Sequence, residues 1–99
     1  MILGSVTKQP NESFKVFIDF AKRLQTGETL NSVSVTSKKV ADGSDSSATI
    51  ISQAAVNGTK LEARVSAGTA GDDHVVQMRA GTTLGNTLED EISLLIRED

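Results

Sequence analysis

The stretch TKLEARVSA, Thr59 to Ala67, decides the fold class of this chain. Its apolar side chains all fall on one face of an extended strand, and its charged side chains fall on the other face. The apolar positions are Leu61, Ala63, Val65 and Ala67. A helix would scatter these residues around its circumference. The stretch therefore predicts a half-buried β-strand.

A turn signal stands directly before this strand. Asn57 and Gly58 can supply the positive φ angles of a type I′ hairpin turn. On the far side of the turn, an apolar run extends from Ala48 to Val56. The pattern predicts an antiparallel hairpin in which this run is the first strand.

Similar alternation recurs on both sides of the hairpin. In HVVQMRA, residues 74–80, every second side chain from His74 onward faces one way, and a turn-rich loop at 68–73 precedes it. Val33 and Val35 alternate with Ser and Thr, and the polar loop ADGSDSS follows at 41–47. Turn signals spaced about 8 to 15 residues apart are typical of a β-sandwich.

Two segments fit helix and strand equally well. Residues 13–27, SFKVFIDFAKRLQTG, have apolar spacing for a helix capped by Ser13 and also show strand alternation. Residues 87–97 have the same ambiguity. Periodicity leaves all-β and α+β open, and all-β is favoured because the intervening strands need partners.

Composition limits the class of protein. Ninety-nine residues make one domain, and 37% hydrophobic content with only three aromatic residues predicts a thin aliphatic core. The chain has no Cys, which suits folding in a reducing cytoplasm and excludes thiolate metal sites. Oligomerisation is the remaining way to reinforce so small a core.

Charge and hydropathy argue against several partners. The net charge is −3 and the ten Lys and Arg residues are scattered, so no basic stripe is available for nucleic acid. No apolar run reaches the length of a membrane span, and the start MILG lacks the basic residues of a signal peptide. We expect a soluble protein that binds neither nucleic acid nor membrane.

His74 is the only histidine and the first candidate for chemistry. Asp72 and Asp73 are close in sequence, but neighbours on a strand face opposite ways, and no nucleophile stands at a known spacing. The expected role of His74 is packing on a sheet face or at an interface.

Other candidate sites fail on spacing. Asp42 and Asp45 lack the order of an EF-hand loop, so a solvated turn is expected. Gly68 and Gly71 lack the Lys-Ser or parallel-strand context of a phosphate loop. We therefore predict no enzyme activity and no catalytic, cofactor-binding or metal-binding residues.

Acidic residues occur at unusual places in two strands. Asp90 falls on the apolar side of its strand and needs a partner or an edge position, and Asp19 also interrupts an apolar segment. Glu89 and Glu91 share the opposite side of that later strand. They are expected to form a solvated face or a guard against edge pairing, with a docking surface for basic residues as the alternative.

Two segments together resemble a known family. KQPNESFKVFIDFAKRLQTGETLNSVSV, residues 8–35, is similar to the opening of phage-encoded fibre-tail adaptors. VSAGTAGDDHVVQMRAGTTLGNTLEDEISLLIRE, residues 65–98, resembles their closing hairpin. The first segment matches at Lys8, Pro10, Phe14, Asp19, Phe20, Ala21, Arg23, Leu24, Gly27, Glu28 and Thr29. The chain departs from the pattern at His74, where Tyr is expected, and at Asn86, where a basic residue is expected.

The resemblance implies an all-β, immunoglobulin-like antiparallel sandwich of about seven strands, in which both ambiguous segments are strands. We assign residues 1–12 to an N-terminal arm and residues 13–99 to the single domain. The implied role is a non-enzymatic structural protein, made in the bacterial host cytoplasm and carried in the virion. Its expected partners are other phage tail subunits and further copies of itself, and no residue marks the contact surface.

A bacterial surface immunoglobulin-like module that binds a carbohydrate or receptor is the alternative. Sugar binding usually uses aromatic platforms, and this chain has no Trp or Tyr. The tail role is therefore favoured.

Overall fold

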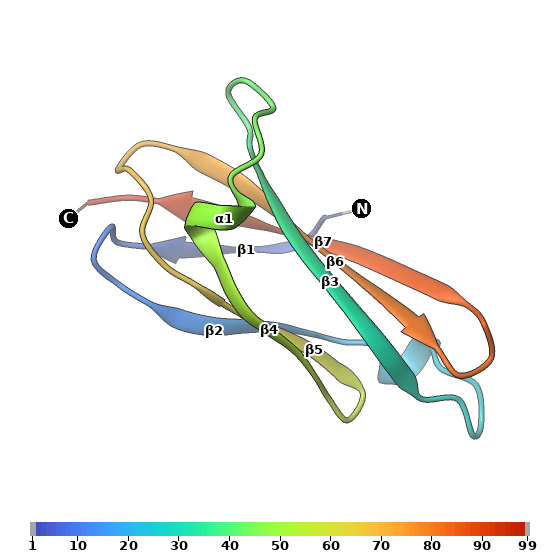
Figure 1. Cartoon of the computed structure of the whole chain (residues 1–99). Helices are drawn as coiled ribbons and strands as arrows, with labels where there is room; N and C mark the ends of the chain where they lie inside the picture. The colour runs from blue at the N-terminus through green and yellow to red at the C-terminus, as the bar shows by residue number, and fades with distance from the viewer. Residues whose placement is uncertain (1, 99) are drawn as a thin grey trace.

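The computed structural model describes residues 2–98 and shows two β-sheets packed face to face (Figure 1). The strands are β1 (Ile2–Lys8), β2 (Phe14–Asp19), β3 (Leu30–Lys39), β4 (Ile51–Asn57), β5 (Lys60–Val65), β6 (Asp73–Thr82) and β7 (Thr87–Ile96). Two one-turn helices interrupt them, the 3-10 helix η1 (Ala21–Arg23) and α1 (Ser47–Ile50). The predicted all-β fold is confirmed.

The strand order identifies the sandwich as immunoglobulin-like. One sheet has the order β1-β7-β6-β3 and the other β2-β5-β4. In immunoglobulin domains, strands B, E and D lie in one sheet and C, F and G in the other. The second to seventh strands of this chain follow that arrangement. The first strand pairs with the last one, and this pair is parallel, so the sandwich is not wholly antiparallel as expected.

The segment 1–12, expected to be an arm, contributes β1 to the larger sheet. Val6 pairs with Leu94 and Lys8 with Ile96 in the parallel ladder, and Val6 packs against the core. A parallel pair needs no tight turn, so two ends of the chain can meet without any local signal. Residues 2–8 are therefore a strand of the larger sheet, although residues 1–12 were expected to form an arm outside the domain.

The stretch that predicted the fold forms β5, the central strand of the smaller sheet. Leu61, Ala63 and Val65 are completely buried, as the alternation predicts. Ala67 is the exception, because the chain has left the strand and Ala67 is exposed with a φ of 58°. β2 and β4 pair antiparallel with β5 on its two sides.

The expected hairpin between β4 and β5 is present, but two of its details differ. Gly58 is the only turn residue with a positive φ, 64°, which fits a type II′ pattern and not type I′. The first part of the expected strand, residues 48–50, lies in α1, where the Ile50 N–H donates to the Ser46 carbonyl at 3.0 Å. Ile50 is thereby buried in the core.

Both ambiguous segments are strands. In β2 the inward side chains Val16 and Ile18 are buried, while the side chain of Phe17 is 53% exposed on the outer face. β7 buries alternate residues from Asp90 to Ile96, and β6 does so from His74 to Thr82. The alternation predicted for these strands is thus confirmed.

The core between the sheets is aliphatic, with one buried phenylalanine. Its buried members are Val16, Ile18, Phe20, Leu30, Ile50, Leu61, Ala63, Val65, Val76, Met78, Ala80, Ile92, Leu94 and Ile96. Within residues 2–98, no helix is long and apolar enough to cross a membrane.

Candidate interaction surfaces

Lys8 of the Lys-x-Pro motif is buried in the fold. Its Nζ donates to the carbonyls of Gln9 at 2.6 Å, Pro10 at 3.1 Å and Ala67 at 2.6 Å. Burial lowers the pKa of the Lys8 ammonium, and the Glu12 carboxylate partly offsets this effect. Lys8 therefore ties the end of β1 to the β5–β6 loop, and its charge is not available to a partner.

Asp90 also has an internal partner. Its side chain is 8% exposed, and its Oδ2 accepts a hydrogen bond from Arg23 Nη1 at 2.7 Å. Arg23 lies on η1 and stacks over the Phe20 ring at 5.5 Å from the centroid. The expectation that Asp90 needs a partner is confirmed. This ion pair fastens η1 to β7.

Glu28 is a third buried charge that the fold satisfies. Its Oε2 accepts hydrogen bonds from the Thr82 hydroxyl at 2.5 Å and the Asn86 amide at 2.9 Å. Its Oε1 accepts from the Gln25 N–H at 2.9 Å. The hydrogen bond from Thr82, followed by those from Gln25 and Asn86, lowers the pKa of Glu28. Asn86, which replaces the expected basic residue, thus binds Glu28 within the chain.

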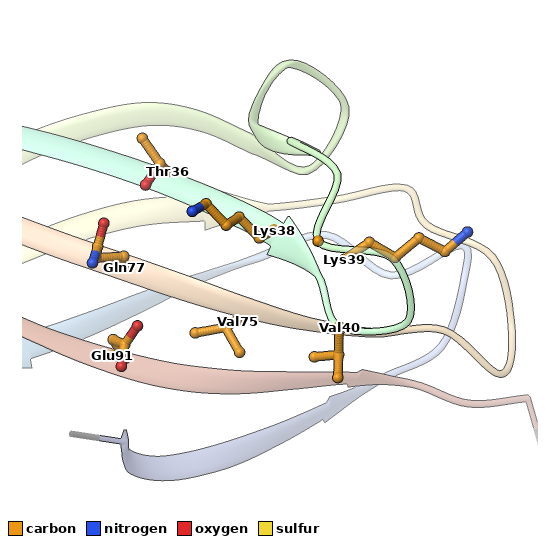
Figure 2. A pocket seen from close by; sticks show the side chains of 8 residues that line it. Thr36, Lys38, Lys39, Val40, Val75, Gln77 and Glu91 are labelled. Atoms are coloured by element: carbon orange, nitrogen blue, oxygen red, sulfur yellow. The ribbon is translucent and has the colours of Figure 1, made fainter.

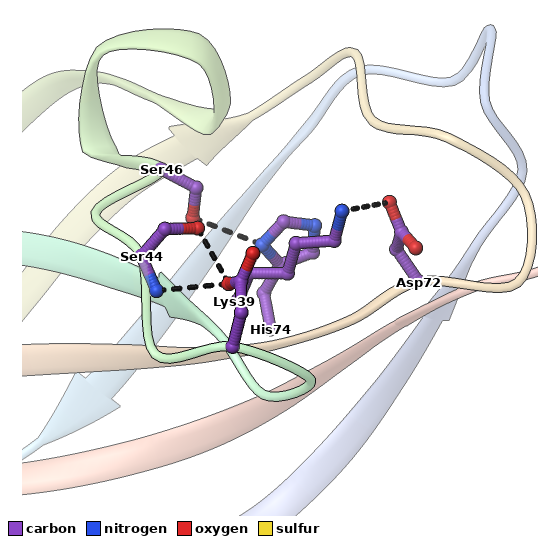
Figure 3. Close-up of polar contacts among 6 residues, drawn as sticks. Lys39, Ser44, Ser46, Asp72 and His74 are labelled. Carbon is purple, nitrogen blue, oxygen red and sulfur yellow. Dashed lines mark hydrogen bonds and ion pairs between the residues drawn. The ribbon is translucent and has the colours of Figure 1, made fainter.

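His74 is buried and makes no catalytic arrangement. Its Nδ1 lies 2.9 Å from Ser46 Oγ (Figure 3). Ser46 Oγ in turn lies 2.7 Å from Ser37 Oγ. Its Nε2 is buried without a partner among residues 2–98. Desolvation lowers the pKa of the His74 imidazole, so the neutral ring is favoured. Asp72 lies beside Lys39, with an O–N distance of 3.4 Å, and does not orient the ring (Figure 3).

The acidic residues of the polar loop are occupied by neighbouring serines. Asp42 Oδ1 accepts from the Ser44 N–H at 3.0 Å and hydroxyl at 2.7 Å. Asp45 Oδ1 accepts from the Ser47 N–H at 2.9 Å and hydroxyl at 2.6 Å. These hydrogen bonds lower the pKa of both carboxyls. Such Asx turns shape the loop.

Asp19 is exposed at the end of its strand, where it has a similar local role. Its Oδ1 accepts from the Ala21 N–H at 2.9 Å and the Thr59 hydroxyl at 2.8 Å, and these bonds lower its pKa. Asp19 therefore joins the end of β2 to the β4–β5 turn. The part of the chain that the structure describes contains no group of three or more potential metal ligands.

The acidic residues Glu89 and Glu91 lie on the unburied side of β7. Glu89 pairs with Arg79 at 2.7 Å across β6 and β7. β1 pairs with β7 from Glu91 onward, so Glu91 lies within the sheet, whereas Glu89 precedes the segment that β1 covers. They belong to the solvated outer face of that sheet.

A hollow of about 300 Å³ opens on this outer face, where the β3–α1 loop bends over the sheet (Figure 2). We call it the sheet hollow. Val40 and Val75 supply its apolar surface, and Lys38 and Glu91 carry charges of opposite sign. Its other lining residues are Thr36, Lys39, Gly43 and Gln77. A hollow of this size and character can receive an apolar side chain from another molecule.

Large apolar side chains are exposed at several points outside the core. The exposed fractions are 58% for Val40, 54% for Leu84, 53% for Phe17 and 36% for Val56. Phe17 lies on the outer face of the smaller sheet, with Lys60 Nζ 4.6 Å from its ring centroid. None of these residues stands out in the sequence as a contact residue. The available signal for Leu84 was a single large apolar residue inside the turn TTLGN.

The sequence of the chain matches a known family. A family model described as "Podophage GP4 fiber-tail adaptor protein gp77" matches residues 8–95. The chain belongs to this fibre-tail adaptor family. No curated protein matches the chain.

Membership makes the chain a phage tail structural protein and confirms the resemblance seen in residues 8–35 and 65–98. Within this adaptor, Lys8 and Glu28 of the matching motif hold loops together inside the fold. Arg23 holds η1 in the same way. These three motif residues therefore stabilise the fold itself.

Proposed function

We propose that this adaptor joins components of a phage tail through protein–protein contacts and catalyses no reaction. It is synthesised in the host cytoplasm and becomes part of the virion. The observation that carries this proposal is a contrast between the buried polar side chains and the exposed apolar side chains. The buried charged groups of Lys8, Glu28 and Asp90 bond to other groups inside the fold, whereas several large apolar side chains are exposed to solvent.

The buried polar side chains are poorly placed to act as catalytic groups. Lys8, Glu28 and Asp90 each contact groups within the chain. His74 is buried and bonded to Ser46 without a carboxylate behind it. An acid–base or nucleophilic mechanism needs such groups to reach a substrate. This arrangement favours a structural role.

The sheet edges offer a second kind of contact. β4 is an edge strand with the sequence ISQAAVN, which has no charged residue, and all its residues after Ile51 are exposed. An open edge can pair with a strand of another protein through backbone hydrogen bonds. Apolar burial at about 25 cal/mol per Å² would add to such pairing, offset by the cost of association.

Mass spectrometry of purified phage particles tests the proposal. We expect the chain in intact virions in a fixed ratio to other tail proteins, and its release together with tail parts when particles are disrupted. A non-structural phage protein serves as the control for carry-over. Absence of the chain from washed particles would contradict the proposed role in the tail.

A complementation experiment tests which surfaces matter. A phage lacking the gene is supplied with the wild-type chain or with Phe17→Ser or Val56→Ser. We expect at least one of these exposed positions to be needed for incorporation, because apolar anchors dominate interfaces. Thr69→Ser, at an exposed loop position, is the control.

A further inference from the structure

The turn between β6 and β7 presents Leu84 at its tip. We call residues 82–86 the leucine turn. The Thr82 N–H donates to the Asn86 carbonyl at 2.9 Å, and the Gly85 N–H donates to the Thr82 carbonyl at 3.0 Å. Gly85 has a φ of 81°, which glycine adopts without strain. The backbone under Leu84 is therefore closed on itself.

A second set of contacts fastens the leucine turn to the preceding loop. The Glu28 carboxylate accepts hydrogen bonds from Thr82 and Asn86. The Thr83 N–H donates to the Thr29 carbonyl at 2.9 Å, and the Thr29 N–H donates to the Thr83 hydroxyl at 3.0 Å. Because the turn is already ordered in the folded chain, binding at Leu84 does not lose the conformational entropy of ordering a loop. Exposed apolar side chains on such rigid supports act as interface anchors.

The sheet hollow lies at the other end of the same strand. Val75, near the start of β6, lines it, whereas the leucine turn begins at Thr82. Seven residues of strand separate these positions by about 23 Å. Figure 1 shows the β6–β7 turn and the β3–α1 loop at opposite ends of the sandwich. Leu84 therefore cannot fill the hollow of its own chain.

We propose that Leu84 of one adaptor inserts into the sheet hollow of a second copy, between Val40 and Val75. The hollow, at about 300 Å³, is large enough for one branched side chain. The residues around Leu84, from Gly81 to Thr87, carry no charge. The hollow is lined by charges of both signs, Lys38 and Glu91. Because the inserted turn is uncharged, neither of these side chains would repel it.

The two surfaces differ, so the contact is head-to-tail. A contact of this type forms a ring if the rotation between copies closes and a filament if it does not. A single side chain in a small hollow gives a weak pairwise contact, which a closed ring reinforces because each copy is held twice. The inference rests on the proposed structural role and adds a second copy of the chain as a partner.

Sedimentation velocity of the wild-type chain between about 10 µM and about 1 mM is the first test. We expect the average mass to rise with concentration. Leu84→Asp and Val40→Asp should each weaken association by at least about tenfold, because each places a charge in the apolar contact. Asn11→Asp, which adds a charge in the exposed loop between β1 and β2, is the control and should associate as the wild type does. Far-UV circular dichroism checks that every variant is folded.

A mixing experiment tests the head-to-tail geometry. The Leu84→Asp chain keeps its hollow, and the Val40→Asp chain keeps its leucine. Their mixture should therefore form heterodimers that grow no further, although each variant alone stays monomeric.

A wild-type chain that stays monomeric up to about 1 mM would overturn the inference. Association that both substitutions leave unchanged would also overturn it, as would a mixture that stays monomeric at a concentration where the wild-type chain forms dimers. None of these results contradicts the proposed tail role, which virion mass spectrometry tests separately.

Discussion

Removing the guanidinium of Arg23 should destabilise the fold far more than removing that of Arg79. Each arginine pairs with a carboxylate on β7 at 2.7 Å, but the carboxylates differ in exposure. The Asp90 side chain is 8% exposed and that of Glu89 is 38% exposed. Arg23→Ala leaves a buried carboxylate without a cation, whereas Arg79→Ala leaves one that water can solvate.

The magnitude follows from this difference in burial. Breaking a fully buried ion pair costs about 3–5 kcal/mol. Arg23 itself is 45% exposed, so water partly replaces it and we expect Arg23→Ala to cost about 2 kcal/mol. Arg79→Ala should cost less than about 0.5 kcal/mol, as exposed pairs usually do.

Urea unfolding followed by far-UV circular dichroism measures both values, since the chain has no Trp or Tyr for fluorescence. With a slope of about 1–2 kcal/mol per M for a domain of this size, the Arg23→Ala midpoint should fall by about 1–2 M. Asp90→Leu added to Arg23→Ala should recover part of the loss, because no charge is then buried. Equal midpoints for Arg23→Ala and Arg79→Ala would refute the reasoning.

Three further predictions concern the scaffold. Gly68→Ala should destabilise the fold by about 1–3 kcal/mol, because Gly68 has a φ of 94° and a Cβ there would lie 3.0 Å from Ile96 Cδ1. Gly71→Ala, with a φ of 93° and open space around it, should cost less in the same urea assay. His74 has a lowered pKa when folded, so stability should fall as the pH drops below about 6.5. Thermal unfolding at several pH values should show that the stability of His74→Phe lacks this dependence on pH. Glu28 also has a lowered pKa, so its stabilisation should be present above about pH 4.3 and vanish at lower pH, and Glu28→Gln should not show this loss.

Local alternation was sufficient for the strands that bury one face. Residues 60–65 and 74–80 show a period of two, and side chains on a strand alternate between faces whatever the strand pairs with. The apolar face of residues 60–65 could therefore be assigned to the core without knowledge of any partner. The turn at Gly58 was visible for the same reason, because its signal lies within a few residues.

Contacts between residues far apart in the sequence could not be predicted from local alternation. The position of Asp90 predicts that it needs a partner, but nothing near it in sequence points to Arg23, 67 residues away. The tie between Lys8 and Ala67 spans 59 residues, and the parallel pairing of β1 with β7 joins the two ends of the chain.

The candidate contact surfaces depend on tertiary structure in the same way. Leu84 appears in the sequence as one apolar residue in a turn, and the sheet hollow combines residues from β3, β6, β7 and a loop. The sequence by itself determined which face of each alternating strand is buried, because that property depends only on the side-chain period. Only the tertiary structure decided which strands meet, which charges pair and where apolar side chains stay exposed, because these depend on how all the strands pack at once.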